Sequence, residues 1–431
     1  MKTLFVFYRT SDGDALSIAF LLIGIVSEHL RRGILSGAFI RRVFYHGPDG
    51  ADSADAVVPR HLFGFVDSYA KFRGAVSEGA PPPPAISLAH PYTPAAARLF
   101  AHHLAPFFSW GGGGGADLLA CFYDTLTSRD GLVVLRRRYP RMSRETGVCV
   151  YDPMTGATSF FPDPMDEEYS GFGDTMTYVL LTPSDYGVGC AFLLLMADFT
   201  GFADPAPGCS SIMIQTVSSS DAAAAGGRGE WRPATTAPCR GSHRSKLLHP
   251  SAVVVGSSIH WVMFGGTGRA QRDYLHVLTY NVCTRVAGLI ELPMDRLPES
   301  YTTSGDANLR LASTTDGSLA MLCREGLKIS VWRLSVSDDA GWAPHAVINT
   351  ETPLLSLLPG MPQPCRILFE CLGERSRVLL FTVKGRGFQG LVVLDIETQE
   401  MHKVDAEIIH IQAIPFEVDL ESRFLRMKTF H

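Results

Sequence analysis

The sequence predicts a mainly β protein, a β-propeller of about six four-stranded blades preceded by a short α-helical N-terminal segment. Two hairpin motifs that alternate along the chain, and apolar strand pairs that precede them, predict this fold. Helical periodicity is nearly absent from residue 120 onward. Repetition at regular intervals indicates a repeat architecture, and four strands per repeat is the plan of a propeller blade.

The first motif is an apolar-alternating run that ends in Tyr or Leu, followed by Asp or Asn, two variable residues, Thr and a second run. Its copies are GVCVYDPMTGATSFFP (147–162), LHVLTYNVCTRVAGLIELP (275–293) and GLVVLDIETQEMHKV (390–404). Alternation of period two predicts strands, and the Asx residue with Thr favours a tight turn between them. In the first copy Pro153 presets φ and Gly156 supplies a positive φ. The repeat positions are Tyr151, Asp152, Thr155 and Gly156, then Tyr280, Asn281 and Thr284, then Leu394, Asp395 and Thr398.

A second hairpin motif lies in each gap between these copies. It runs from a strand through Ser-Asp and a Gly-containing loop to Trp, one residue and Pro, at 210–235 and again at 327–348. Trp231 and Trp342 are therefore predicted to occupy equivalent positions, each opening a returning strand. The steps from 151 to 280 and from 280 to 394 are too long for one blade and suit two.

Apolar strand pairs at 130–138, 189–197, 251–266, 316–326 and 376–385 precede the outer hairpins. One inner pair and one outer hairpin make a four-stranded sheet, so five blades follow directly, and residues 60–120 have the length for a sixth. We expect residues 63–66 and 411–420 to share a blade and close the ring. Two unrelated β-sandwiches are the alternative, but they explain the alternating motifs less well.

Composition limits the functional classes. Hydrophobic residues make up 46% of 431 residues and charged residues 19%, as expected for stacked sheets. A net charge of −5 argues against nucleic-acid binding, which needs a basic face. Nine cysteines without close pairing indicate buried free thiols in a reducing compartment, so we expect a cytoplasmic or nuclear location.

The N-terminal part is predicted to be helical and not membrane-bound. The apolar run LFVFY ends at Arg9 without a cleavage site, which argues against export, and residues 15–26 are too short to span a bilayer. Residues 15–45 are predicted to form one or two helices and 95–108 a helix on the rim. We therefore divide the chain into a helical segment, 1–45, and a propeller domain, 46–431.

Signatures of catalysis and of metal or cofactor binding are weak. The GGTG run at 265–268 lacks the residues that complete a phosphate loop and is interpreted as a hairpin. His102 and His103 are adjacent and face different ways on a helix, and His260 is interpreted as a core residue. No nucleophile, base and metal-ligand set converges, so we predict no catalytic residue, no metal and no cofactor.

A basic cluster lies after the 131–138 strand. It is interpreted as a solvated loop, with a nuclear-import or acidic-partner patch as the alternative. Its members are Arg136, Arg137, Arg138, Arg141 and Arg144.

Four stretches resemble plant-type F-box proteins with an F-box-associated, kelch-like β-propeller domain of unknown function. HLRRGILSGAFIRRVFYHGPDG (29–50) resembles the end of an F-box, and HLFGFVDSY (61–69) the strand that follows it. GLVVLRRR (131–138) and VCVYDPMTGATSFFPDP (148–164) resemble the strand and the Pro-x-Thr-Gly hairpin of the associated domain.

The resemblance departs at the start of the chain. A complete F-box opens with Leu-Pro and a Glu-Ile-Leu pattern, which residues 1–26 lack, so the F-box is truncated or degenerate. The family implies a non-catalytic substrate-binding subunit of an SCF-type (Skp–cullin–F-box) ubiquitin ligase, with a protein substrate and a Skp-family adaptor as partners. A stand-alone propeller scaffold and a propeller enzyme remain as alternatives, and apolar inner strands favour binding over catalysis.

Overall fold

The computed structural model describes residues 61–69, 86–88, 123–137, 147–152, 157–164, 175–185, 188–203, 209–224, 229–240, 244–265, 274–297, 309–314, 316–335, 341–404 and 411–419. Two compact units divide the chain. One comprises Phe63–His90 and Phe100–Glu417, and the other Met1–Leu62, Pro91–Leu99 and Val418–His431. The helices expected over 15–45 and 95–108 lie outside the described residues. The first unit holds the β-propeller.

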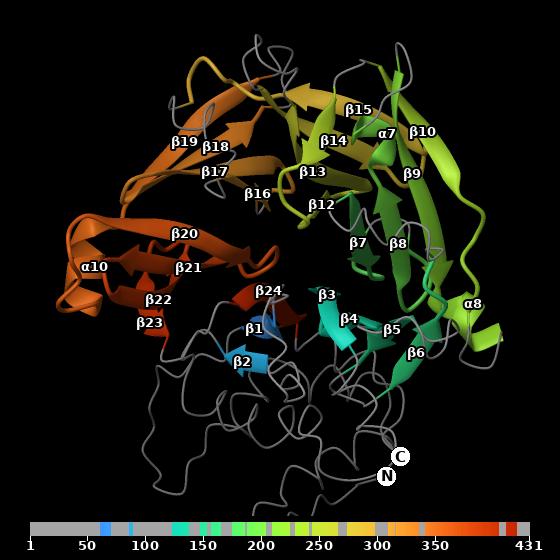
Figure 1. The fold of residues 1–431 in the computed structure, drawn as a ribbon, viewed down its shortest axis with the longest axis horizontal. Coiled ribbons are helices and arrows are strands. Elements are labelled where there is room, and N and C mark those ends of the chain that lie inside the picture. The colour runs from blue at the N-terminus through green and yellow to red at the C-terminus, as the bar shows by residue number, and fades with distance from the viewer. Residues whose placement is uncertain are drawn as a thin grey trace, which may run out of the picture. The chain divides into compact units, whose positions relative to one another are not determined.

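Five antiparallel sheets follow one another along the chain, each formed by consecutive strands (Figure 1). Blade 1 contains β3 (Tyr123–Arg129), β4 (Leu132–Arg137), β5 (Val148–Tyr151) and β6 (Thr158–Phe161). Blade 2 contains β7 (Met176–Leu181), β8 (Leu193–Asp198), β9 (Cys209–Ser218) and β10 (Thr235–Arg240). Blade 3 contains β11 (Ser245–Leu247), β12 (Val253–Val255), β13 (Ser258–Gly265), β14 (Tyr274–Asn281) and β15 (Val286–Glu291). Blade 4 contains β16 (Leu309–Ser313), β17 (Leu319–Glu325), β18 (Lys328–Leu334) and β19 (Trp342–Asn349). Blade 5 contains β20 (Cys365–Leu372), β21 (Val378–Gly385), β22 (Phe388–Asp395) and β23 (Met401–Val404).

Blade 3 keeps the same plan although it has five strands. Both β11 and β12 pair with β13, at opposite ends of it, so two short strands share the first position of the blade. The predicted alternation of inner pairs and outer hairpins is thus the order of strands within each blade.

The two ends of the propeller domain meet in a sixth, smaller sheet. It has the order β2 (Ile86–Leu88), β1 (His61–Tyr69) and β24 (Ile411–Asp419), so the predicted pairing of residues 63–66 with 411–420 in one sheet is confirmed. The Ser128 hydroxyl of β3 donates to the Pro415 carbonyl of β24, and Ala413 packs with the core of blade 5. This closing sheet therefore lies between the last blade and the first.

The predicted β-propeller is confirmed, but its blade count needs correction. The structure has five four-stranded blades and not six, because the N-terminal part of the domain contributes only β1 and β2 to the closing sheet among the described residues. The described helices are short connections: α7 (Thr200–Ala203), α8 (Ser219–Ala224) and α10 (Glu351–Leu357). None of the helices in the described ranges has the length and apolar character needed to cross a membrane.

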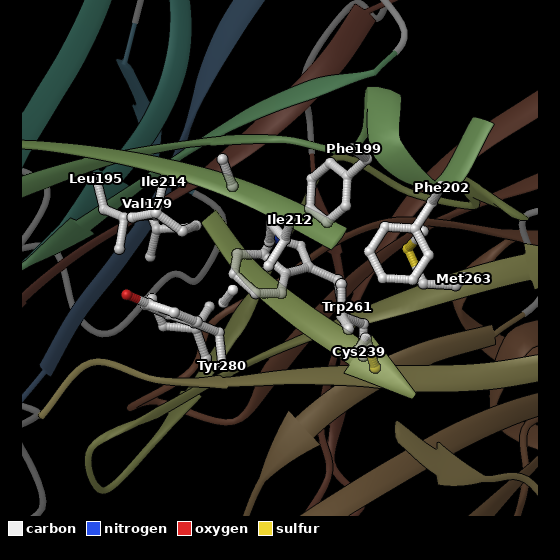
Figure 2. Close-up of a cluster of buried hydrophobic side chains, with 14 of the residues drawn as sticks. Val179, Leu195, Phe199, Phe202, Ile212, Ile214, Cys239, Trp261, Met263 and Tyr280 are labelled. Atoms are coloured by element: carbon white, nitrogen blue, oxygen red, sulfur yellow. The ribbon is translucent and has the colours of Figure 1, made fainter. Parts of the chain in front are cut away.

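The core lies between neighbouring blades. Figure 2 shows the cluster between blades 2 and 3, in which Trp261 is fully buried and stands edge-on to Phe199 with ring centroids 5.4 Å apart. Tyr280, a predicted repeat position, belongs to the same cluster. Similar clusters join blade 1 to 2, 3 to 4 and 4 to 5. Because alternate residues of a strand face opposite sides, each blade presents one apolar face to each neighbour, which explains the unusually apolar strands.

Seven cysteines lie in the described residues, and the prediction of buried free thiols is confirmed for four of them, while Cys190 and Cys365 are half-buried. Cys149, Cys239, Cys323 and Cys371 are buried free thiols, whereas Cys283 is exposed in the β14–β15 turn. Burial raises the pKa of Cys149 and of Cys323, so both stay protonated thiols at neutral pH.

Candidate functional site

The first strands of the five blades and β24 of the closing sheet surround a central cavity of about 80 Å³. Each sheet contributes a short stretch of residues to its lining. These stretches are 126–129 of β3, 178–180 of β7, 249–253 up to the start of β12, Val262 of β13, 309–311 of β16, 371, 372 and 374 at the end of β20, and 413–415 of β24. We call this space the central channel. It is the place where side chains from distant parts of the sequence come together.

Arg129, the last residue of β3, links three blades at one end of the central channel. Its guanidinium donates to both carboxylate oxygens of Asp185 at 2.8 and 2.5 Å and to Glu374 at 2.5 Å. Asp185 lies in the turn after β7 and Glu374 in the turn after β20, so residues 56 and 245 positions away in sequence meet here. The side chains are 10%, 6% and 20% exposed, which makes the ion pairs largely buried.

Arg375 makes a second connection between the same turns. Its Nε lies 2.8 Å from Asp130 of blade 1, and its Nη2 donates to the Ser184 hydroxyl of blade 2. Hydroxyls of Thr182 and Ser184 donate to Asp130 as well. Blades 1, 2 and 5 are therefore joined by charged and hydroxyl side chains that lie in the turn between the first and second strand of each blade.

Glu417 of β24 brings the closing sheet into this network. Its carboxylate accepts the backbone N–H groups of Arg375 at 3.1 Å and Ser376 at 2.7 Å. A Cβ on Gly373 would overlap the Ser376 hydroxyl and the Glu417 carboxylate, so the turn after β20 requires glycine here. Blades 3 and 4 also contribute, because the Val254 N–H donates to Glu374 and the Ser313 hydroxyl to the Glu374 carbonyl. We call the whole set the cross-blade network.

Electrostatics in the cross-blade network favour the charged form of Arg129. Burial alone would lower the pKa of Arg129, but Glu374 and Asp185 outweigh it and raise that pKa. Burial would raise the pKa of Asp130, yet Arg375 with the two hydroxyls lowers it. Burial does raise the pKa of Glu374, against the attraction of Arg129. Paired charges of this kind hold a geometry, because removal of one partner leaves the other buried and uncompensated.

The cross-blade network was missed in the sequence, where the inner strands were expected to be apolar. That expectation is wrong at the end of the channel where the first strands turn. A charged pair stands in this turn in two blades, Arg129-Asp130 and Glu374-Arg375, and Ser184-Asp185 in a third. Alignment of the repeats on their first turns shows this pattern, which an alignment on the outer hairpins does not.

The repeat residues lie in the outer hairpins of alternate blades. Tyr151, Tyr280 and Leu394 are buried near the ends of β5, β14 and β22. Asn281 accepts the backbone N–H of Thr284 at 2.9 Å, and Asp395 that of Thr398 at 3.0 Å. Thr155 and Gly156 lie outside the described residues, while Asp152 opens the same turn in blade 1, its N–H donating to the Ala157 carbonyl at 2.9 Å.

The residue four positions after the Asx residue has a positive φ in the two fully described copies. Arg285 and Gln399 both have φ of 59°, and each donates its N–H to the carbonyl of the Asx residue. In the first copy the same offset gives Gly156, the residue expected to supply a positive φ. Two copies thus hold a non-glycine residue in the left-handed conformation, which an ordinary side chain adopts at some cost.

The two motif tryptophans make the same hydrogen bond. Trp231 Nε1 donates to the Pro162 carbonyl at 2.8 Å and Trp342 Nε1 to the Glu291 carbonyl at 3.0 Å, in each case at the end of the preceding blade's last strand. Trp342 is buried at the start of β19, whereas Trp231 is half-buried before β10, where its ring packs against Phe161.

The basic cluster and the histidines singled out in the sequence are only partly within the described residues. Arg136 and Arg137 lie in β4 and not in a loop, and Arg136 pairs with Asp163 at 3.2 Å. Arg138, Arg141, Arg144, His102, His103 and most of the GGTG run lie outside the described residues. His260 is buried with Nδ1 3.3 Å from the Val253 carbonyl, and burial lowers its pKa to about 4, so it is neutral at pH 7.

A groove of about 320 Å³ opens between blades 4 and 5. Apolar and polar side chains from both blades line it in about equal number. The ionisable side chains of the lining are Arg333, His345, Arg377 and Glu397. Turns after β16, β20 and β22 border the groove, so it opens at the end of the blades that carries the cross-blade network. We call this the blade 4–5 groove.

These features define the class of protein, which is a β-propeller. Its ring is closed by a sheet that combines strands from both ends of the domain, and ion pairs between blades lie beside its central channel. Residues 114–430 match the family described as "Domain of unknown function (DUF7595)", and the chain belongs to that family. A comparison with curated proteins finds none that matches.

Solved structures with a related fold are distant. The periplasmic gluconolactonase PpgL of Pseudomonas aeruginosa is 13% identical over 81% of this chain and 84% of that one, with a TM-score of 0.37. TolB from Acinetobacter baumannii is 11% identical over 67% and 69%, with a TM-score of 0.25. The Nup133 β-propeller domain of Vanderwaltozyma polyspora is 11% identical over 66% and 75%, with a TM-score of 0.27. At this distance the neighbours say nothing about substrate or activity.

Proposed function

We propose that the propeller is a non-catalytic protein-recognition module whose partner binds at the blade 4–5 groove. The observation that carries the proposal is a groove of about 320 Å³, lined by a mixture of apolar and polar side chains and bordered by the turns of two blades. This volume lies within the range of ligand pockets and is large enough to receive side chains of a partner. Variable turns on a rigid scaffold are where recognition residues concentrate.

The state of the axial ionisable groups supports recognition over catalysis. Asp130, Asp185 and Glu374 each accept from an arginine, and Glu417 caps the turn after β20. A general base needs access to a substrate proton, and these carboxylates are engaged in joining blades. A propeller enzyme is the alternative, and it would place its substrate against these same groups.

The finer proposal concerns the partner machinery. The resemblance of residues 29–67 and 131–163 to F-box-associated propeller proteins supports a substrate-binding subunit of an SCF-type ubiquitin ligase, acting in the cytoplasm or nucleus. Affinity capture of a purified Skp-family adaptor by the full chain, but not by residues 46–431, is the expected result. If neither chain captures the adaptor, the propeller acts as a stand-alone scaffold.

A substitution in the groove tests the recognition surface itself. His345 is exposed on β19 and lines the groove, so His345→Trp fills part of it, whereas Val286→Trp changes an exposed residue of β15 outside the groove. We expect cross-linking mass spectrometry in cells to show partners lost with His345→Trp and retained with Val286→Trp. Equal partner sets for both variants and the unchanged chain would contradict the proposed surface. Turnover of a small substrate that is lost on changing Glu374 would instead establish the enzyme alternative.

A further inference from the structure

Arg310, in the middle of β16, is a buried arginine in the wall of the central channel that forms no ion pair with a carboxylate of the described residues. Its side chain is 7% exposed, and the residue lines the channel. Leu309 and Leu311 on either side belong to the core between blades 3 and 4, so alternation turns Arg310 the other way, toward blade 5.

The hydrogen bonds of Arg310 leave much of its guanidinium unused. Nη2 donates to the Phe369 carbonyl of β20 at 2.9 Å and Nη1 to the Leu309 carbonyl at 3.1 Å. Nε is buried and has no hydrogen-bond partner. A guanidinium has five N–H groups, so three remain for another acceptor.

Arg310 also has no counter-ion within the part of the chain that the structure describes. Glu370 is the carboxylate that most favours its charged form, yet among the described residues no carboxylate oxygen lies within the 4.0 Å of an ion pair with it. Burial lowers the pKa of Arg310 to about 10, so the side chain still carries its charge at pH 7. Arg129, which also lines the channel, has two carboxylate partners, which shows how this fold otherwise pairs a buried arginine.

His249 places a second donor in the same wall of the channel. Its Nδ1 accepts the Ser251 N–H at 3.1 Å, so in the neutral ring the proton is on Nε2 and can be donated. Burial lowers its pKa well below the ordinary value, with a further contribution from the charge of Arg310. Both side chains line the channel, so the two donors belong to one cavity.

The size of the cavity limits the ligand. A single water molecule needs about 10–15 Å³ of cavity volume. The cavity of about 80 Å³ can therefore hold a group of four or five non-hydrogen atoms together with few waters. Charge limits it further, because one negative charge balances Arg310, whereas a phosphate dianion would add a second charge to a channel that Glu374 also lines. We propose that the central channel binds a small monocarboxylate, held by the Arg310 guanidinium and the His249 Nε2–H.

Acetate is the probe for the test. The full chain, labelled with ¹⁵N, is titrated with sodium acetate at constant ionic strength against sodium chloride, and the ring resonances of His249 are followed by NMR. A His249→Gln sample assigns those resonances among the 14 histidines of the chain. We expect a saturable shift of the Nε2 resonance with acetate and none with chloride. An Nε2 resonance that does not move with acetate would overturn the proposal.

Arg310→Met should weaken acetate binding by roughly tenfold or more, as expected when charge-assisted hydrogen bonds are lost. The matched control is Arg324→Met, since Arg324 of β17 also donates to a β20 carbonyl, that of Ile367 at 2.6 Å, but does not line the channel. The control should bind acetate within about twofold of the unchanged chain. Arg310→Lys keeps the charge, should retain weakened binding, and serves if the Met variant does not fold. Equal weakening by Arg324→Met, or tighter binding of inorganic phosphate than of acetate, would refute the assignment.

Discussion

Replacement of Arg129 by Met should destabilise the propeller more than replacement of any exposed arginine, because Arg129 neutralises two carboxylates from two other blades. Asp185 and Glu374 are 6% and 20% exposed in their side chains, and Met preserves most of the apolar stem while removing the charge. Loss of one partner from a buried pair costs about 3–5 kcal/mol. We therefore expect a loss of about 3–5 kcal/mol in the free energy of unfolding at neutral pH.

The loss should shrink at acidic pH. Burial already raises the pKa of Glu374 in the folded chain, and removal of Arg129 takes away an attraction that opposes this rise. A carboxyl whose folded pKa is raised contributes stability below its ordinary pKa and loses it as the pH rises through the folded value. The difference between variant and unchanged chain should therefore be smaller at about pH 5 than at about pH 7.5.

Urea unfolding followed by tryptophan fluorescence measures both effects. The control is Arg136→Met, because Arg136 pairs with Asp163 inside one blade at 3.2 Å and is 34% exposed, so its loss should cost about 0–1 kcal/mol. Equal losses for the two variants, or a loss in Arg129→Met that does not depend on pH, would refute the argument that the cross-blade network joins the blades by buried charge.

Three further predictions concern the turns and the motif tryptophans, all measured by urea unfolding. Trp342→Ala should cost about 3–5 kcal/mol and Trp231→Ala less, because Trp342 is buried and Trp231 is half-buried; equal costs would contradict this. Gly373→Ala should cost about 1–3 kcal/mol because the new methyl group meets Ser376 and Glu417, while Gly189→Ala, with open space around it, should be close to neutral. Arg285→Gly and Gln399→Gly should each stabilise by up to about 1 kcal/mol, since relief of a positive φ exceeds the entropy that glycine costs; a loss of stability would show that their side chains hold the turns.

The sequence by itself determined the blade plan. Strand alternation and turn residues act over a few positions, so the outer hairpins at Tyr151, Tyr280 and Leu394 and the inner pairs before them could be predicted locally. The closing sheet was also predictable, because a ring of blades requires its ends to pair. Its third strand, β2, was not predictable, since it is only three residues long.

Only the tertiary structure decided what lies at the axis. Arg129 and Glu374 are 245 residues apart and meet because the first strands of blades 1 and 5 converge on one channel. Arg310 gives no signal in the sequence either, as one charged residue in an apolar strand reads as a surface position until its neighbours are known. Local patterns encode which faces of a strand are apolar, but radial closure decides which polar residues share a buried space, and that depends on the whole ring.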